Sequence, residues 1–350
     1  MELSSLRPFP ASFVLPNLAN ITRQAFNLKL NPHSQSANSA MKSWFKSFHV
    51  YDEQKSREFL EAGKFDLYAA LSFPDADLQH LETCLAFFFW AFSTDDLSDE
   101  GDLQSKPEEV QVGVDISTSA LSSHAPTSLD FPYAAMLQSL FNRIKTTATK
   151  GASERFIQAF KDWSSSQVMQ SRNRSKLLLP SVEDFILMRR NTIGAALVEA
   201  MIEYSLDLDL PDYVFRDPVV IAMSEATTDI MTWPNDLCSF NKEQADGDYQ
   251  NLVCCLMAQY DLGLQDAVDR LVGMISTRVR DYITLKEQLP LFGAEVDTML
   301  RKYHAALEHY VQGTIVWYYS SPRYFHGEQI IEKESTRIIL FSKASSKDCS

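Results

Sequence analysis

The segment from Leu78 to Asp99 constrains the fold most, because it is apolar nearly all round until its acidic end. A helix that is apolar on every side has to be buried among other elements. Helical spacing of apolar residues recurs along most of the chain, whereas the alternation typical of strands is scarce. Further helices are predicted at residues 133–144, 152–170, 182–204, 218–241, 252–289 and 296–319. We therefore expect an all-α fold, a single-domain helical bundle around one core.

The chain divides into three parts by composition. Residues 1–40 are rich in Pro, Asn and Ser, which predicts an irregular N-terminal strap. Residues 41–335 form the predicted helical domain, and within them residues 100–129 are polar and predict an exposed loop. Residues 336–350 are predicted to form a polar C-terminal tail. With 45% apolar residues, the chain can bury a substantial core and is too apolar to be disordered.

The net charge and the cysteines exclude several classes of protein. A formal charge of −14 argues against nucleic acid or an anionic membrane as the main partner. The five cysteines are odd in number and include no Cys-x-x-Cys pair, which disfavours a disulfide framework or zinc site and favours a cytoplasmic location. We expect no signal peptide, because the N-terminus lacks a basic region followed by an unbroken apolar run. We expect no membrane insertion, because the most continuous apolar stretch is too short to span a bilayer.

Three aspartates, Asp95, Asp96 and Asp99, end the apolar segment. A helix C-terminus already carries partial negative charge, so clustered carboxylates are unfavourable there without a cation. Asp95 and Asp99 share a helix face with Phe92 and Phe88, which lie one and two turns earlier. The pattern predicts an apolar wall that leads to an anionic rim, and the alternative is a solvated acidic helix end. A standard EF-hand is excluded, because the twelfth position of such a loop is a proline.

A second set of oxygen-bearing side chains lies on the predicted helix that begins at Pro218. Asn235, Ser239 and Glu243 are spaced four residues apart, so they line one stripe and together can chelate a hard cation. Lys242 lies beside this stripe, as expected if the bound ligand is a polyanion. The alternative is the polar surface of an amphipathic helix.

The two oxygen sets suit Mg²⁺ better than a metal enclosed by protein. Mg²⁺ keeps several waters and is typically held by one or two carboxylates together with substrate phosphates. The acidic charge of the chain agrees with this prediction, because bound metal ions, and not the protein surface, would receive an anionic substrate.

Taken together, these segments resemble the class I terpene synthases, and most closely the fungal sesquiterpene cyclases. The first set matches the family's DDxxD motif, and the second matches its NDxxSxxxE triad. The run from Arg189 to Gly194 resembles the diphosphate-sensing segment, with Arg190 as the sensor and Gly194 as the effector position. Arg323-Tyr324 resembles the late RY pair, and Leu30-Asn31-Pro32-His33 resembles the N-terminal strap. These landmarks keep the family's order and span roughly residues 30–325.

The resemblance implies a central apolar pocket and a cluster of three Mg²⁺ ions. The implied metal ligands are Asp95, Asp96, Asp99, Asn235, Ser239 and Glu243. The implied diphosphate-binding groups are Arg190, Lys242, Arg323 and Tyr324. The candidates for aromatic contact with a carbocation are Phe88, Phe92 and Trp317, for which ordinary core packing is the alternative.

The implied activity is that of a sesquiterpene synthase, which ionises farnesyl diphosphate, cyclises the carbocation and releases diphosphate. The partner is then a small allylic diphosphate, and the protein is expected to be a monomer or a homodimer. A chain-elongating prenyl transferase is one alternative, although a second DDxxD motif is absent. A non-catalytic helical scaffold is the other, although it does not explain the arginines beside the metal-type stripes.

Pro234 departs from a regular helix directly before Asn235. Proline cannot donate the backbone hydrogen bond expected in a helix interior. The sequence therefore leaves two alternatives, a kink in one helix or a new helix that starts at the proline.

Overall fold

The computed structural model describes residues 1–99, 106–122, 130–176, 178–325 and 330–342. The α-helices within these ranges are α1 (Leu18–Thr22), α2 (Ser34–Lys46), α3 (Glu53–Gly63), α4 (Phe65–Ser72), α5 (Leu78–Asp99), α6 (Pro107–Ala120), α7 (Pro132–Thr147), α8 (Lys150–Ser175), α9 (Val182–Thr192), α10 (Ala195–Ser205), α11 (Pro218–Asp246), α12 (Leu252–Tyr260), α13 (Leu264–Glu287) and α14 (Ala294–Ser320). The remaining elements are the 3₁₀ helices η1 (Leu3–Ser5), η3 (Val214–Arg216) and η4 (Ile330–Glu332), and the strands β1 (Ser12–Pro16) and β2 (Ser335–Ile339).

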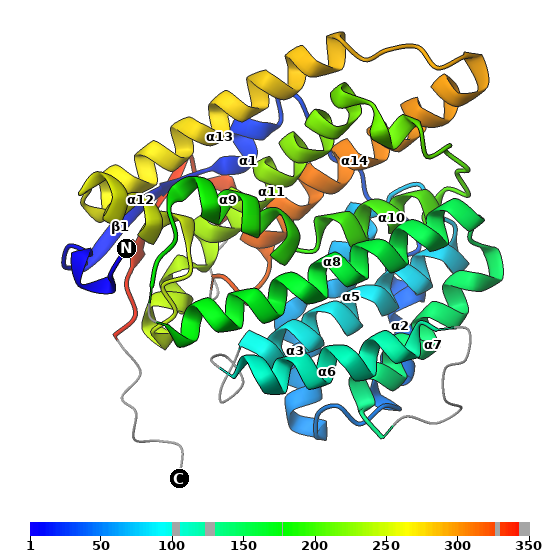
Figure 1. The fold of residues 1–350 in the computed structure, drawn as a ribbon, viewed down its shortest axis with the longest axis horizontal. Coiled ribbons are helices and arrows are strands. Elements are labelled where there is room, and N and C mark those ends of the chain that lie inside the picture. Colours follow the sequence, from blue (N-terminus) through cyan, green and yellow to red (C-terminus); the bar gives the residue numbers. More distant parts are fainter. Residues whose placement is uncertain (100–105, 123–129, 177, 326–329, 343–350) are drawn as a thin grey trace.

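The helices surround one contiguous hydrophobic core, and the prediction of an all-α fold is confirmed. The apolar helix α5 is buried as expected and packs against α2, α4, α7 and α10. On the other side of the bundle, α11 packs against α9, α12, α13 and α14. α14 contacts both groups, because it also packs against α4 and α10. Figure 1 shows α13 and α12 along one flank of the molecule and α6 and α7 along the opposite flank.

Two predicted helices are each divided in the structure. The segment 182–204 forms α9 and α10, separated at Gly194, whose φ of 75° lies in the left-handed region that favours glycine. The segment 252–289 forms α12 and α13, separated by a turn in which Asp261 has a φ of 50°. Each break redirects the chain, and the first one lies at the cavity described below.

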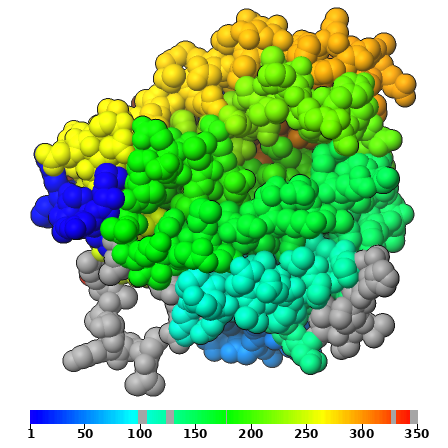
Figure 2. Space-filling model, in the orientation of Figure 1, coloured from blue at the N-terminus to red at the C-terminus, as the bar shows by residue number. Residues whose placement is uncertain are grey.

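The prediction of a loop at residues 100–129 is wrong for residues 107–120, which form α6. Pro107 stands at the first helical position and is followed by two glutamates in the first turn, both of which favour a helix start. The polar composition concealed these signals. α6 packs against α7 and α8, and Figure 2 shows α6, α8 and α9 covering much of one face of the molecule.

The strap and the tail are tied together by a two-stranded antiparallel sheet. β1 pairs with β2 in a register that places Ser12 opposite Ile339. The predicted strap 1–40 therefore contains β1, α1 and the start of α2, and the predicted boundary at residue 335 falls within β2. Asn241 of α11 donates to the Ile339 carbonyl at 2.9 Å and accepts from the Phe341 backbone N–H at 2.8 Å. The C-terminal strand thus braces α11.

Among the described residues, no helix combines the length and the hydropathy needed to cross a membrane.

Candidate active site

A cavity of about 190 Å³ lies between the two groups of helices, and both predicted ligand sets open onto it. Its walls come from α4, α5, α8, α9, α10, α11 and α14 and from the segments that follow α11 and α14. Twelve of the predicted site residues line it, namely Phe88, Phe92, Asp95, Asp96, Gly194, Asn235, Ser239, Lys242, Glu243, Trp317, Arg323 and Tyr324. Arg190 does not line it, and the side chain of Asp99 lies outside the described residues.

Stacked aromatic rings form much of the apolar wall. Tyr68 of α4 lies between Phe88 and Trp317, with 4.1 Å between ring centroids on each side and interplanar angles of 16° and 10°. Phe92 lies with its centroid 5.3 Å from that of Trp317. The indole N–H of Trp317 donates to the carbonyl of Gly63 at 2.7 Å, so its only donor is already used. These rings therefore give the cavity π-faces with few polar groups.

The acidic end of α5 is held by side chains from elsewhere in the fold. Gln167 of α8 donates from Nε2 to Oδ1 of Asp95 at 3.1 Å. Arg323 donates from Nη2 and Nη1 to the two carboxylate oxygens of Asp96, at 2.7 and 3.2 Å. A bidentate pair of this kind fixes the plane of the carboxylate as well as its position. Asp95 and Asp96 are therefore oriented before any ligand is bound.

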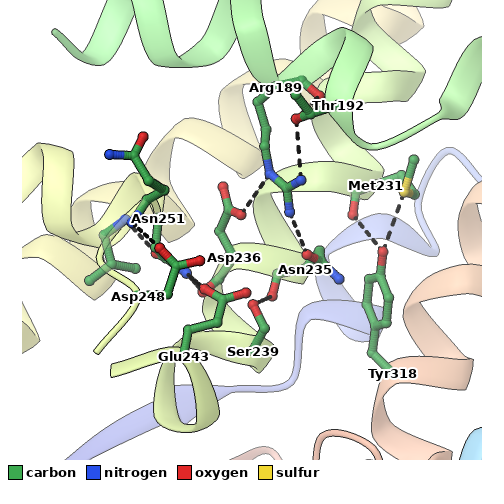
Figure 3. Close-up of polar contacts among 12 residues, drawn as sticks. Arg189, Thr192, Met231, Asn235, Asp236, Ser239, Glu243, Asp248, Asn251 and Tyr318 are labelled. Atoms are coloured by element: carbon green, nitrogen blue, oxygen red, sulfur yellow. Dashed lines mark hydrogen bonds and ion pairs between the residues drawn. The ribbon is translucent and has the colours of Figure 1, made fainter. Parts of the chain in front are cut away.

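α11 continues through Pro234 and does not restart at Asn235. Proline removes one helical hydrogen bond and crowds the carbonyls of the preceding turn. The carbonyl of Met231 in that turn accepts a hydrogen bond from the Tyr318 hydroxyl at 3.3 Å (Figure 3). The carbonyl that loses its helical partner is that of Ile230, four residues before Pro234, so this contact does not replace the lost bond. Asn235, Ser239 and Glu243 nevertheless all reach the same cavity.

Arg323 and Tyr324 connect the two helices that carry the predicted metal ligands. Arg323 holds Asp96 of α5, as described above, and the next residue, Tyr324, accepts a hydrogen bond from Nδ2 of Asn235 in α11 at 3.2 Å. Burial raises the pKa of Tyr324 well above its usual value, so its hydroxyl keeps its proton. The predicted RY pair thus lies at the junction of both ligand sets.

Glu243 is a predicted ligand whose pKa is shifted by its surroundings. Burial raises its pKa to about 7, and the carboxylates of Asp248 and Asp236 add to this rise. Oε2 of Glu243 accepts a hydrogen bond from Nδ2 of Asn251 at 2.8 Å, which partly opposes it. A buried carboxylate among other carboxylates is the environment in which a bound cation is most stabilising.

The structure places Arg190, the predicted sensor, away from the cavity. It donates from Nε and Nη2 to the two oxygens of Asp229 in α11, at 2.9 and 2.8 Å, and it pairs with Glu225 at 2.8 Å. Asp229 is buried and also accepts from Nε of Arg278 in α13 at 2.9 Å. The guanidinium of Arg190 is thereby engaged between α9, α11 and α13.

Arg189, the residue directly before Arg190, faces the cavity instead. It lines the cavity and donates to Oδ1 of Asn235 at 2.7 Å and to Oδ1 of Asp236 at 3.1 Å (Figure 3). Burial alone lowers the pKa of Arg189, but Asp236 and Glu243 outweigh it and raise the pKa above its usual value. Nη1 also approaches the hydroxyl of Thr192 at 3.4 Å, close to the helix break. Successive helical residues point about 100° apart, which explains why only one of the two arginines reaches the cavity.

The predicted ligands have the chemistry that Mg²⁺ requires. All of those whose side chains are described present oxygen atoms to one cavity. In the described part of the chain, no group of three or more His, Cys, Asp or Glu side chains could hold a metal ion by itself. So sparse a set fits a hard cation whose coordination is completed by water and substrate phosphates.

Comparison with known proteins agrees with this geometry. The sequence model of "Terpene synthase family 2, C-terminal metal binding" matches residues 86–281, which include both ligand sets. "Sesquiterpene synthase Agr1" from Cyclocybe aegerita is 30% identical over 97% of this chain and 97% of its own length. This chain belongs to terpene synthase family 2. As a terpene synthase it is an enzyme, a class I terpene cyclase, and its family has a metal-binding region.

Other relatives share the sequence or the fold of this terpene synthase. "Alpha-muurolene synthase" from Coprinopsis cinerea is 29% identical over 94% of this chain and 78% of its own length. The solved structure of cucumene synthase superimposes with a TM-score of 0.74 at 18% identity, covering 85% of this chain and 99% of that one. Germacradien-4-ol synthase from Streptomyces citricolor superimposes with a TM-score of 0.73 at 19% identity, covering 84% and 96%. The structural likenesses establish the shared helical fold.

Several residues that line the cavity of this terpene synthase were not predicted from the sequence. Tyr68 and Trp163 come from α4 and α8, where no motif marks them. Tyr310 and Tyr318 lie on α14. Tyr310 is seven residues before Trp317, a helical spacing that could have identified it. Arg189, one position from the predicted sensor, is among the unpredicted polar residues of the cavity.

Proposed function

We propose that this terpene cyclase is a sesquiterpene synthase that ionises farnesyl diphosphate in the presence of Mg²⁺, cyclises the carbocation and releases diphosphate. One observation carries the proposal, namely a cavity lined by the predicted oxygen ligands, by arginines and by aromatic rings. The names of the relatives from Cyclocybe aegerita and Postia placenta, which are sesquiterpene synthases, support a substrate of fifteen carbons.

The residues that would hold three Mg²⁺ ions are Asp95, Asp96, Asp99, Asn235, Ser239 and Glu243. Bound Mg²⁺ would supply Lewis-acid stabilisation of the departing diphosphate. The hydrogen bonds from Gln167 and Arg323 support this assignment, because they orient Asp95 and Asp96 toward a common cavity before substrate arrives.

We propose Arg189, in place of Arg190, as the residue that senses the diphosphate. Its guanidinium lines the cavity and contacts Asn235, so it can bind the diphosphate beside the second ligand set. Lys242, Arg323 and Tyr324 would complete the diphosphate-binding groups, since all three line the same cavity. Charge-assisted hydrogen bonds from such groups strengthen as negative charge develops on the leaving group.

The aromatic wall would protect and guide the carbocation. Water has to be excluded, because it would capture the cation as an alcohol. The π-faces of Phe88, Phe92 and Trp317 can each stabilise a nearby cation by about 0.5–2 kcal/mol. Gly194, at the break between α9 and α10, would serve as the effector position that carries the response of Arg189 to this wall.

The test is incubation of the purified protein with farnesyl diphosphate and Mg²⁺, followed by gas chromatography with mass detection. A cyclic hydrocarbon or alcohol of fifteen carbons is expected, and none without Mg²⁺ or with Glu243→Gln. Geranyl and geranylgeranyl diphosphate are compared in parallel to establish the chain length. Consumption of isopentenyl diphosphate would instead identify a chain-elongating prenyl transferase, and stabilisation by Mg²⁺ and diphosphate without any product would identify a non-catalytic scaffold.

We also propose that the enzyme works in the cytoplasm as a monomer or a homodimer. The free state of the four described cysteines, all buried, agrees with a reducing compartment. Fluorescence microscopy of a tagged protein and its elution volume in size-exclusion chromatography test the two statements.

A further inference from the structure

Asn251 is a buried residue whose carboxamide is hydrogen-bonded to the protein at both its oxygen and its nitrogen. It is 0% exposed and lies at the N-cap of α12. Its Oδ1 accepts from the backbone N–H of Val253 at 2.9 Å, and its Nδ2 donates to the backbone carbonyl of Asp236 at 2.7 Å and to Oε2 of Glu243 at 2.8 Å (Figure 3). The cap fixes which end of the amide is oxygen, so the donor has to face Glu243.

The backbone of Asn251 is equally fixed. Its N–H donates to the carbonyl of Tyr249 at 2.8 Å, and its carbonyl accepts from the N–H of Cys255 at 3.1 Å. The residues that follow it in α12, including Leu252 and Cys254, are fully buried in the core. Asn251 therefore presents its donor from a rigid support.

Glu243 is a side chain that needs such a support. It has three rotatable bonds, and the carboxylates of Asp236 and Asp248 near it repel its negative charge. Without a donor behind it, the carboxylate would turn away from these neighbours or sample several rotamers. A ligand that is disordered before binding loses affinity, because the metal has to order it.

We propose that Asn251 is the positioning residue that holds Glu243 in the orientation required for divalent-metal binding. The inference rests on the proposed function, because it takes Glu243 as a metal ligand. Asn251 does not itself reach the metal or the substrate in this proposal. It acts through one oxygen of Glu243 and links that oxygen to the helix cap of α12 and to the backbone of α11.

The test compares Asn251→Ser with Asn31→Ser. Serine still caps a helix but cannot extend its hydroxyl to the carboxylate as the amide does. Asn31 is a matched control, because it is 1% exposed and its Nδ2 donates to the carbonyls of Phe73 and Ala76 at 2.9 and 2.8 Å. Its Oδ1 accepts from the backbone N–H of His33 at 2.9 Å. It thus has the same bonding pattern without contact to a predicted metal ligand.

The measurement is the melting temperature in a titration with MgCl₂ at fixed inorganic diphosphate. We expect Asn251→Ser to raise the Mg²⁺ concentration at half-maximal stabilisation by about 10- to 100-fold. Asn31→Ser should lower the melting temperature without metal yet leave that concentration within about twofold, since it removes only structural hydrogen bonds. Saturating Mg²⁺ should restore most of the turnover of Asn251→Ser, as a positioning role requires.

An unchanged Mg²⁺ requirement in Asn251→Ser would overturn the inference. If that variant fails to fold, Asn251→Asp replaces it, because aspartate keeps the cap and the shape but offers Glu243 no donor. An unchanged requirement in Asn251→Asp overturns the inference as well. Glu243→Gln separates failure of the proposed metal site from failure of the positioning role of Asn251. If it also leaves the Mg²⁺ response unchanged, the proposed metal site fails, whereas a response lost only in Glu243→Gln leaves the proposed function intact and removes the role of Asn251.

Discussion

Replacing Arg189 and Arg190 separately by glutamine should distinguish the arginine that acts on the substrate from the one that supports the fold. The two residues are adjacent on α9, but only Arg189 lines the cavity. Arg190 instead shares the buried carboxylate of Asp229 with Arg278. The pair of substitutions therefore changes the same chemical group on two sides of one helix.

The expected magnitudes follow from what each substitution leaves behind. The side chain of Asp236 is 1% exposed, so Arg189→Gln leaves a buried carboxylate without its cation, which costs about 3–5 kcal/mol of stability. The rate is affected separately. Loss of a donor to the departing diphosphate should lower the rate by about 10²–10³-fold, which corresponds to about 3–4 kcal/mol of activation free energy. Arg190→Gln leaves Asp229 paired with Arg278, so we expect about 1–2 kcal/mol of destabilisation and a rate change below about tenfold.

The assay combines urea unfolding with single-turnover release of diphosphate from farnesyl diphosphate at saturating Mg²⁺. The double variant Arg189→Gln/Asp236→Asn serves to separate the two effects. It removes the unpaired charge, so most of the stability should return. The rate should stay low, because the guanidinium is still missing from the cavity.

Two results would refute this reasoning. One is an equal loss of rate in Arg190→Gln and Arg189→Gln when both are fully folded, since that would return the sensor role to Arg190. The other is recovery of the rate together with the stability in the double variant, which would make Arg189 purely structural.

Three further predictions concern the wall, the packing and the pH dependence. Tyr68→Leu removes the ring that stacks between Phe88 and Trp317 and holds them in place. Loss of such a stacking contact, worth about 0.5–1.5 kcal/mol, should lower turnover by about 2- to 10-fold and change the product mixture in gas chromatography. Gly313→Ala would place its new Cβ 2.8 Å from both Cβ and the carbonyl oxygen of Leu71, and it should lower the free energy of unfolding in urea by about 1–3 kcal/mol. Gly273→Ala is the control, because it has open space around it and should be neutral or stabilising. Equal effects of the two substitutions would contradict the packing argument. Burial raises the pKa of Glu199 to about 7. Its carboxyl therefore contributes stability that is present below about pH 4.5 and is lost as the pH rises through 7. Relative to the unsubstituted protein, Glu199→Gln should gain up to about 3 kcal/mol in free energy of unfolding between pH 5 and pH 8, and parallel pH profiles of the two proteins would contradict this.

Motifs with fixed helical spacing allowed much of the site to be predicted. Asp95 and Asp96 lie at the end of an apolar helix, and Asn235 and Glu243 share one stripe of another. Local periodicity therefore predicts each pair, and the packing of the two helices brings both pairs to one cavity. The sequence left open whether the helix restarts at Pro234, and α11 continues through it. No local pattern contains that information.

Other features depend on tertiary contacts that spacing cannot give. A sequence motif does not distinguish which of two adjacent arginines reaches the cavity. Arg190 is directed away from the cavity because its guanidinium pairs with Asp229 on α11. Tyr68 belongs to a short helix without any motif, yet it is central to the aromatic wall. The helix α6 was hidden by polar composition, because its buried side packs on α7 and α8 and needs few apolar residues.

The pairing of β1 with β2 makes folding of the proposed metal-binding stripe of α11 a non-local event. Ser12 meets Ile339, and residues 339–341 in turn hold Asn241, which lies between Ser239 and Glu243 on α11. Contacts between such distant parts of a chain form late, since a long loop has to close first. A partly folded chain can thus contain most of its helices while Asn235, Ser239 and Glu243 are not yet held in the positions proposed for metal binding. Binding of Mg²⁺ with diphosphate would then report that the entire chain has reached its native topology.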